Sequence, residues 1–569
     1  MNWWDQAQIG AQLARAGLAW LRRDTGYPSP VPENPKFMSA RDAVALIDDG
    51  DVVAVSGMGA HQHASIVYCA IREAFEATGH PAGLTVMNVG GQGGRGLLPG
   101  TLEELGRPGL CSRFVTSHFE TFRALLDLAE VGQCELQCIP FGVLTLLFEA
   151  LARGKDSVLT TTGMGTFLDP RVGRGSPVVD GSDEQLIAVH GGRLRYRIPP
   201  VDVALFNAPA ADRHGNIYAK HCAVIGESLE LARAAKRSHG SVIANVGLVV
   251  DEGYDQIFLP ADAVDAIVYH PDTEQTAAVF HRTHWPMFTT ESDVPIEEGL
   301  ARVRFINSLV PALARRTPAD AVLARLAAAT LVANAGAGAV VSIGTGLPEQ
   351  VTPVIFEAGA LDAMTFVVES GVVGGLPVPG VYFGAALGPD EIIPSVQLFK
   401  RCATRLDATC LGVLEVDSQG NVNVSKRGAG PRHYVGPGGF IDFCEAAKTI
   451  IFVSAWMHRG EIVVDGAHLR LRKRGTPKFV DRVDEVTFNG PRALKAGKRI
   501  FYVTHVGVFE LTARGMQLAQ VMPGIDVRKD ILDFAPMKIL LPDGKLPRVS
   551  RSIVTGEHFA LRRPTSRGE

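Results

Sequence analysis

The sequence predicts an α/β protein built from two tandem, related, open α/β domains. Two segments of the chain open with the same order of helix, strand and glycine loop, and one turn motif recurs after each of them. Apolar strand-like runs alternate with helical patterns in both halves. Such alternation is typical of mostly parallel sheets that helices cover on both faces. With 569 residues, 46% of them hydrophobic, the chain can fill more than one core.

Residues 1–37 are expected to form an amino-terminal helical extension. Trp4, Leu13, Leu18 and Leu21 make an apolar stripe at helical spacing, and a proline-rich stretch then interrupts the pattern. The basic and apolar regions of a signal peptide are not found in this segment. We expect the helix to pack on the body of the protein or on a partner subunit, in preference to anchoring the chain in a membrane.

The first half, residues 38–275, opens with a predicted helix and a predicted strand. Ser39 is the expected N-cap of the helix, and Gly50 is expected to end it. Residues 51–55 then form an apolar run rich in valine, which reaches a glycine loop at residues 56–59.

The second half, residues 318–569, repeats this opening after a connection at residues 276–317 with weak periodicity. Thr317 is the expected N-cap of its first helix. The apolar run at residues 339–343 is the expected strand, and it leads into Gly344-Thr345-Gly346.

A recurring turn supports an internal duplication. Residues 212–217 and 417–422 both read Asp-x-x-Gly-Asn followed by an apolar residue, and each follows an apolar run. Alone, the motif would indicate only a hairpin. Its recurrence in the same order after the same opening predicts that the two halves are copies of one unit.

Composition excludes several classes of function. The formal net charge is only −4 with no block of like charges, so we expect no nucleic acid and no anionic membrane as a partner. No apolar run approaches the roughly 18 residues of a membrane-spanning helix. The eight cysteines are scattered without a CxxC pair, which disfavours a metal site and suits a reducing, cytoplasmic location.

Glu369 is the leading candidate for a chemical role. A β-branched apolar run stops at this carboxylate, and Gly371, Gly374 and Gly375 follow in a turn. Open α/β sheets bind ligands at the carboxyl ends of their strands. A surface turn is the alternative for any single glutamate. At a strand end, Glu369 suits either a general base or a covalent nucleophile, and the residues alone leave both open.

Glycine clusters at residues 90–96, 344–346 and 436–439 could present backbone N–H groups to a phosphate or an oxyanion. None matches GxxxxGK[ST], and none is a GxGxxG motif followed by an acidic residue about 20 positions on. An enzyme that uses ATP or NAD is therefore disfavoured. The chain also contains no Gly-x-Ser-x-Gly motif, which a serine hydrolase of the common type would carry.

Seven motifs, taken in order, resemble the family I CoA-transferases, most closely the propionate and acetate CoA-transferases whose α-like and β-like halves are fused. The resemblance covers about residues 38–545. Each motif alone is weak, but all of them together in this order are specific for the family. The motifs are residues 163–171, 369–377, 383–386, 417–425, 436–441, 504–509 and 523–526.

The resemblance implies a transfer of CoA between an acyl-CoA and a free carboxylate by a ping-pong mechanism. Glu369 of the β-like half would be the nucleophile, and it would pass through an acyl-glutamyl anhydride and a glutamyl-CoA thioester. The other residues we assign to the oxyanion hole or to CoA are Gly438, Gly439, Gly371, Gly374 and Gly375. We expect no tightly bound cofactor, CoA as substrate and covalent thioester, and a homo-oligomer, either a dimer or a tetramer.

The substrate pocket is assigned to Phe141, Gly59 and Gln92. Relatives typically carry Pro-Gln-Gly where this chain has Pro140-Phe141-Gly142. A ring in place of an amide removes a donor, so we expect the pocket to prefer an acid more apolar than acetate or acetoacetate, or of a different shape.

Two alternatives remain open at this point. One is an acyl-CoA hydrolase on the same scaffold, in which water replaces the second acid. The other is an α/β ligand-binding protein without turnover. The basic loop at residues 426–433 also has two interpretations, contact with an anionic substrate group or a solvated charged surface.

Overall fold

The computed structural model describes residues 3–21, 23–96, 99–179, 184–271, 286–310, 313 and 315–561. Part of the predicted connection at residues 276–317 lies outside these ranges. The rest contains helix α7 (Ile296–Leu309), so part of the connection is helical. The domain boundaries themselves stay a prediction.

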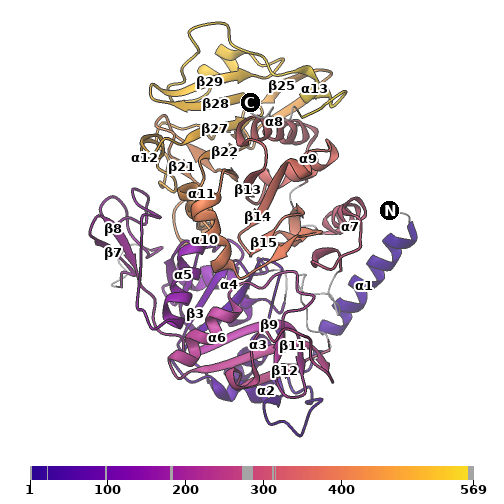
Figure 1. The fold of residues 1–569 in the computed structure, drawn as a ribbon. Coiled ribbons are helices and arrows are strands. Elements are labelled where there is room, and N and C mark those ends of the chain that lie inside the picture. Colours follow the sequence, from indigo (N-terminus) through magenta and orange to yellow (C-terminus); the bar gives the residue numbers. More distant parts are fainter. Residues whose placement is uncertain are drawn as a thin grey trace.

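Two large sheets organise the chain, one in each half (Figure 1). The strands of the first sheet run in parallel, apart from a short antiparallel strand, β10 (Ile217–Tyr218), on the edge of β9. In order across the sheet, they are β1 (Phe37–Met38), β12 (Ala266–Tyr269), β11 (Ser241–Val250), β9 (Val203–Asp212), β2 (Val52–Met58), β3 (Leu84–Gly90), β4 (Cys111–Thr116) and β5 (Glu135–Cys138).

The second sheet has a parallel centre and antiparallel margins. In order, its strands are β18 (Glu391–Ile392), β15 (Val372–Val373), β14 (Met364–Val368), β13 (Ala339–Ile343), β19 (Ala408–Gly412), β22 (Thr449–Val453), β27 (Arg499–Thr504), β28 (Gly507–Thr512) and β29 (Gly515–Val521).

The strand order confirms the two related α/β units. The first sheet contains the run β12-β11-β9-β2-β3, and the second contains the run β27-β22-β19-β13-β14. Strands β2 and β13 therefore take the same central place, with the next strand along the chain (β3 or β14) on one side and a later strand (β9 or β19) on the other. The recurring turns agree, because Asp212 accepts from the backbone N–H of Asn216 at 2.9 Å and Asp417 does so from Asn421 at 3.0 Å.

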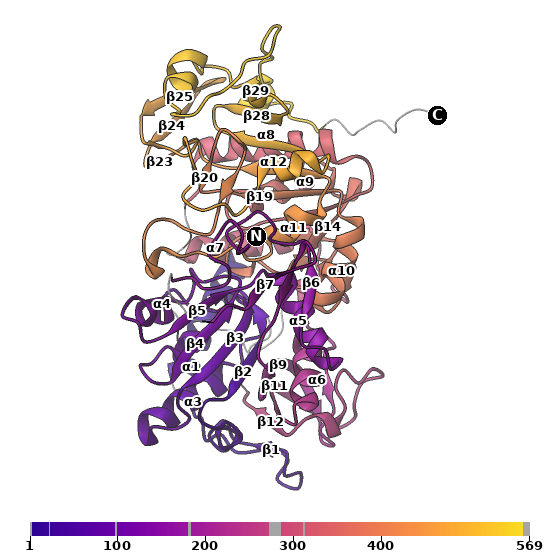
Figure 2. The same cartoon turned by 90° about the vertical axis from the view of Figure 1, so that its left-hand side faces the viewer.

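Helices cover the sheets, and three of them meet where the two halves join (Figure 2). Helix α5 (Phe141–Ala152) of the first half packs there against α10 (Ser395–Arg405) and α11 (Phe440–Ala446) of the second. The other helices are α1 (Trp3–Leu21), α2 (Ala40–Ala43), α3 (Ser65–Thr78), α4 (Arg123–Glu130), α6 (Ser228–Arg237), α8 (Pro318–Ala335), α9 (Val351–Glu357), α12 (Gly490–Lys495) and α13 (Arg551–Thr555).

The predicted helix starts are correct, and one predicted helix end is wrong. Thr317 and Asp320 form a reciprocal capping box on α8, and the hydroxyl of Ser39 caps α2. The helix expected to run to Gly50 stops at Ala43 and continues only as a short 3₁₀ turn. The backbone N–H of Asp48 donates instead to the carboxylate of Asp51, a local bond that competes with helix formation.

Helix α1 forms as predicted, but its predicted apolar stripe only partly faces the protein. Leu13 packs on the core, and Ile9, which the stripe did not include, is buried. Trp4, Leu18 and Leu21 are exposed. Within the described residues, no helix combines the length and the apolar character that crossing a membrane requires.

Candidate active site at the junction of the two halves

Glu369 is the residue that directly follows β14, as the apolar run predicts. Its side chain is half-buried at the carboxyl end of the strand. The chain turns at once, because the N–H of Gly371 donates to the carbonyl of Val368 at 2.9 Å. The hydroxyl of Ser370 donates to the carbonyl of Gly384, so the neighbour of Glu369 is fixed as well. The carboxylate is therefore held on a rigid turn at the ligand-facing edge of the sheet.

The three glycines after Glu369 build this turn. Gly371 has a φ of +102°, and a Cβ atom on it would lie 1.8 Å from the carbonyl oxygen of Ile393. A Cβ atom on Gly374 would lie 1.9 Å from a carboxylate oxygen of Asp390, and one on Gly375 would lie 2.3 Å from the carbonyl of Leu387. The amides of Gly371 and Gly374 donate to the carbonyls of Val368 and Phe366, which both belong to β14. These glycines serve the close approach of backbone segments, and a contact with CoA stays a prediction.

Gly439 contacts Glu369 directly. Its N–H donates to Oε2 of Glu369 at 3.0 Å, and a Cβ atom in its place would lie 2.2 Å from that oxygen. The N–H of Gly438 donates instead to the carbonyl of Ser117 at 2.9 Å. The structure thus separates two residues that the sequence treats alike, since only the amide of Gly439 points at the carboxylate.

Burial raises the pKa of Glu369 to about 7, and the hydrogen bond from Gly439 acts in the opposite direction. A carboxyl group with a raised pKa is more basic, and thus more nucleophilic, than a solvated one once it is ionised. At neutral pH a substantial fraction of Glu369 is ionised. The site therefore suits either proton abstraction or covalent attack.

The loop after β2 brings the first half to the site. Nε2 of His61 lies 3.1 Å from the carbonyl oxygen of Tyr382, next to the segment that Ser370 binds. Gly59 has a φ of +56°, and a Cβ atom on it would lie 3.2 Å from the carbonyl of Phe383. Of the three predicted pocket residues, Gly59 thus lies on the contact between the two halves.

Gln92 is fully buried, and its side-chain amide holds the backbone of this loop through hydrogen bonds. Its Nε2 donates to the backbone carbonyls of Ser56 and His61, each at 3.0 Å, and its Oε1 accepts from the hydroxyl of Tyr68 at 3.1 Å. With its amide engaged in this way, Gln92 holds the loop after β2 in place, and its assignment to the substrate pocket stays a prediction.

Phe141 is buried at the start of α5 and begins a row of three rings. The centroid of its ring lies 5.5 Å from that of Phe399, which in turn lies 5.3 Å from that of Phe443. A Cβ atom on Gly439 would lie 3.3 Å from the ring of Phe443. The aromatic row therefore connects Phe141 to the surroundings of Glu369.

Asp442 is a polar residue of the site that sequence reasoning missed. It lies on α11, three residues after Gly439, and accepts from the N–H of Gly142 at 3.0 Å. The available signal was its place one residue beyond the glycine motif at residues 436–441.

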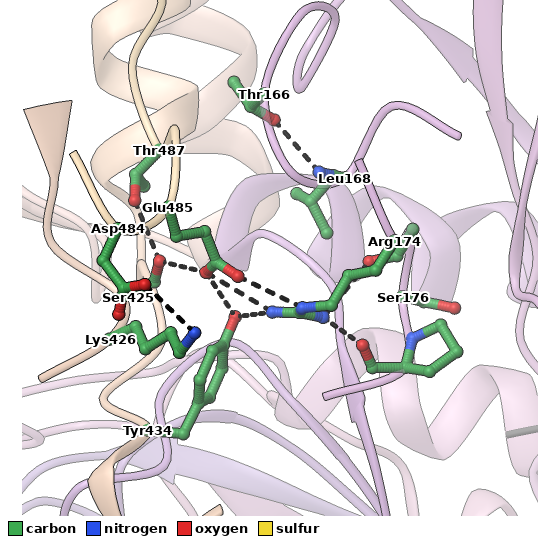
Figure 3. A network of polar contacts seen from close by, with 12 residues as sticks. Thr166, Leu168, Arg174, Ser176, Ser425, Lys426, Tyr434, Asp484, Glu485 and Thr487 are labelled. Atoms are coloured by element: carbon green, nitrogen blue, oxygen red, sulfur yellow. Dashed lines mark hydrogen bonds and ion pairs between the residues drawn. The ribbon is translucent and has the colours of Figure 1, made fainter. Parts of the chain in front are cut away.

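A largely buried ion pair ties the two halves together at their junction (Figure 3). Nε of Arg174 in the first half lies 3.1 Å from Oε2 of Glu485 in the second, and the guanidinium also contacts the hydroxyl of Tyr434. The hydroxyl of Ser425 donates to the same carboxylate at 2.5 Å. The guanidinium stacks on the rings of Phe167 and Tyr434.

The basic loop at residues 426–433 takes part in the same junction. Arg427 pairs with Glu120 at 2.8 Å, and Arg432 pairs with Asp127 at 2.7 Å, both across the two halves. These cations already have carboxylate partners within the chain, which favours a structural role for the loop over recognition of an anionic substrate group.

Comparison with known proteins gives consistent matches. The family model described as Coenzyme A transferase matches residues 37–270. Caffeate CoA-transferase of Acetobacterium woodii is 32% identical over 515 residues, which cover 88% of this chain and 93% of that protein. Acetate CoA-transferase YdiF of Escherichia coli K12 is 28% identical over 529 residues, which cover 90% of this chain and 93% of the relative.

Solved structures extend these matches to the fold. The apoenzyme of acyl-CoA transferase YdiF from Escherichia coli O157:H7 superposes with a TM-score of 0.81 at 25% identity, over 96% of this chain and 99% of that one. A thioester complex of YdiF with CoA superposes with a TM-score of 0.78 at 24% identity, over 92% of this chain and 96% of that one.

Proposed function

Because this chain belongs to family I of the coenzyme A transferases, enzymes that move CoA from an acyl-CoA to a carboxylate, we propose that it works through covalent intermediates on Glu369. The observation that carries the proposal is the placement of Glu369 at the end of β14, with its Oε2 bound by the N–H of Gly439. A positioned carboxylate with a raised pKa suits a nucleophile.

In the first step, a carboxylate oxygen of Glu369 attacks the thioester carbonyl of the donor acyl-CoA. The carbon–sulfur bond breaks, CoA leaves as a thiolate, and an acyl-glutamyl anhydride remains. The thiolate then attacks the glutamyl carbonyl and expels the first acid as a carboxylate, which leaves a glutamyl-CoA thioester. An acceptor carboxylate attacks this thioester, and the same two steps in reverse release the new acyl-CoA and the free carboxylate of Glu369.

Gly439 has a defined part in this sequence. The oxygen of Glu369 that its N–H binds at rest becomes an oxyanion when the CoA thiolate attacks the glutamyl carbonyl. A donor already aimed at that oxygen stabilises the tetrahedral state, and removal of one such donor costs on the order of 3–4 kcal/mol in other enzymes. The predicted role of Gly438 in the oxyanion hole finds no similar support, because its N–H binds Ser117.

Mass spectrometry tests the covalent mechanism. After incubation with an acyl-CoA from a broad set and rapid digestion, the peptide that contains Glu369 should gain the mass of CoA. A Glu369→Gln variant treated in parallel is the control. Absence of the adduct with every acyl-CoA would contradict the proposal, and loss of thioester in plain buffer at the rate of transfer would instead favour a hydrolase.

We also propose that the acceptor or donor acid is larger and more apolar than acetate. The row of rings formed by Phe141, Phe399 and Phe443 supports this, as does the resemblance to a caffeate CoA-transferase. An apolar wall gains from burying apolar substrate surface, about 25 cal/mol per Å².

Phe141→Gln should shift the ranking of substrates toward small acids. The variant replaces a buried ring with an amide that can donate to a short carboxylate, and it removes apolar contact for a large acid. We expect kcat/KM to rise for acetate relative to an aryl acid by roughly tenfold, the range that a small change in a pocket produces. Competition between the two acids measures this ratio, and an unchanged ratio would contradict the assignment of Phe141 to the pocket.

A further inference from the structure

Asp442 joins the second half of the chain to the start of a first-half helix. Its carboxylate accepts from the N–H of Gly142 on the first turn of α5. Pro140, the N-cap residue of α5, gives the helix no side-chain acceptor. The first N–H groups of a helix need acceptors from outside it, so Asp442 takes the role of the missing cap across the junction.

Two more hydrogen bonds connect the contact between Asp442 and Gly142 to Glu369. The N–H of Phe141 donates to the carbonyl of Gly438 at 3.1 Å, and the N–H of Gly439 donates to Glu369 at 3.0 Å. Gly439 is the N-cap residue of α11, Gly438 precedes it, and Asp442 lies in the first turn of the same helix. A displacement of Asp442 would therefore move the amide that holds the carboxylate of Glu369.

We propose that Asp442 is a positioning residue for Glu369, because it holds the start of α11 and with it the amide of Gly439 that binds the carboxylate of Glu369. The inference rests on the proposed role of Glu369 as the nucleophile.

The charge of Glu369 acts on the carboxyl group of Asp442. Burial raises the pKa of Asp442 to about 8, the bond from Gly142 acts against burial, and the negative charge of Glu369 raises the pKa further. The pKa of Glu369 is about 7, so both groups titrate close to neutral pH. We take the form with Glu369 ionised and Asp442 neutral as the reactive one.

The other ionisable groups around Asp442 do not change their charge between about pH 6 and about pH 9. Tyr196 on β8 (Arg193–Tyr196) and Cys444 on α11 both face its charge, and burial raises the pKa of each well above its ordinary value. Helix α10 presents the uncharged ring of Phe399 to Gly142. Between about pH 6 and about pH 9, the change of charge beside Asp442 therefore comes from the pair itself.

The pH profile of kcat/KM separates the pair from a merely structural contact. In the wild type, kcat/KM should rise as Glu369 ionises near pH 7 and fall as Asp442 ionises near pH 8, because a doubly charged pocket repels an anionic substrate. Asp442→Asn keeps an acceptor for the N–H of Gly142 but cannot ionise. We expect this variant to lose the descending limb.

Asp442→Ala removes both the acceptor and the charge. We expect kcat to fall by about 10- to 100-fold with a smaller change in KM, because the amide of Gly439 is no longer held in place. Persistence of the descending limb in Asp442→Asn, or a kcat and pH profile of Asp442→Ala equal to those of the wild type, would overturn the proposal. If the alanine variant does not fold, the asparagine variant decides alone.

The CoA adduct on Glu369 keeps the two proposals distinguishable. A wild-type protein that forms no adduct contradicts the nucleophilic role of Glu369. A wild-type protein that forms the adduct, together with an unchanged pH profile in Asp442→Asn, contradicts only the role of Asp442.

Discussion

Replacement of Glu369 by glutamine is expected to lower kcat by about 10⁴-fold or more, the loss seen when a covalent nucleophile is removed from an enzyme. The amide is close to the carboxylate in size, and its oxygen can still accept from the N–H of Gly439. What it loses is the negative charge and the ability to form an anhydride. Steady-state transfer of CoA between two acids measures the effect.

The control for this variant is stability. Burial disfavours an ionised carboxylate, so replacement of Glu369 by a neutral side chain should leave the unfolding midpoint unchanged or raise it slightly. A variant that folds normally and still turns over within about tenfold of the wild type would contradict the nucleophile assignment.

Arg174→Met is expected to lower the free energy of unfolding by about 3–5 kcal/mol, the range for breaking a buried ion pair by removing one partner. The side chains of Arg174 and Glu485 are only 14% and 10% exposed, so water screens the pair little. Methionine fills much of the volume but leaves the carboxylate of Glu485 without its guanidinium. The urea midpoint, at constant m value, measures the loss.

Two further variants make the Arg174 experiment specific. Arg197→Met breaks the exposed pair with Asp156 and should leave the urea midpoint nearly unchanged, because water screens this pair. Adding Glu485→Gln to Arg174→Met removes the uncompensated charge and should recover part of the lost stability. Equal midpoints for the Arg174 and Arg197 variants would show that the buried pair contributes no more than a surface one.

Local sequence signals predicted the architecture and the position of Glu369 at the end of a strand. The caps at Ser39 and Thr317, the apolar runs and the Asp-x-x-Gly-Asn turns depend on contacts within a few residues. Glu369 could be singled out because a strand end followed by glycines is also a local pattern. These features are found in the structure because tertiary packing favours the same conformations as the local sequence does.

The remainder of the site depends on contacts between distant segments. The sequence treats Gly438 and Gly439 alike, and only the carbonyl of Ser117 decides which amide points at Glu369. Gln92 was expected to face a substrate, yet backbone carbonyls of a loop some thirty residues earlier take its amide. The sequence does not show the contact of Asp442, because its partner Gly142 lies in the other half of the chain.

The repeated strand order also bears on how the molecule evolved. Strand β3 takes the place in the first sheet that β14 takes in the second, and the segment after β3 carries Gln92 where the segment after β14 carries Glu369. One unit thus carries the proposed nucleophile after this strand, while the other carries a buried amide that holds the neighbouring loop. If both units serve the proposed reaction in one polypeptide, selection on either half acts on that reaction, and neither unit is free to diverge alone.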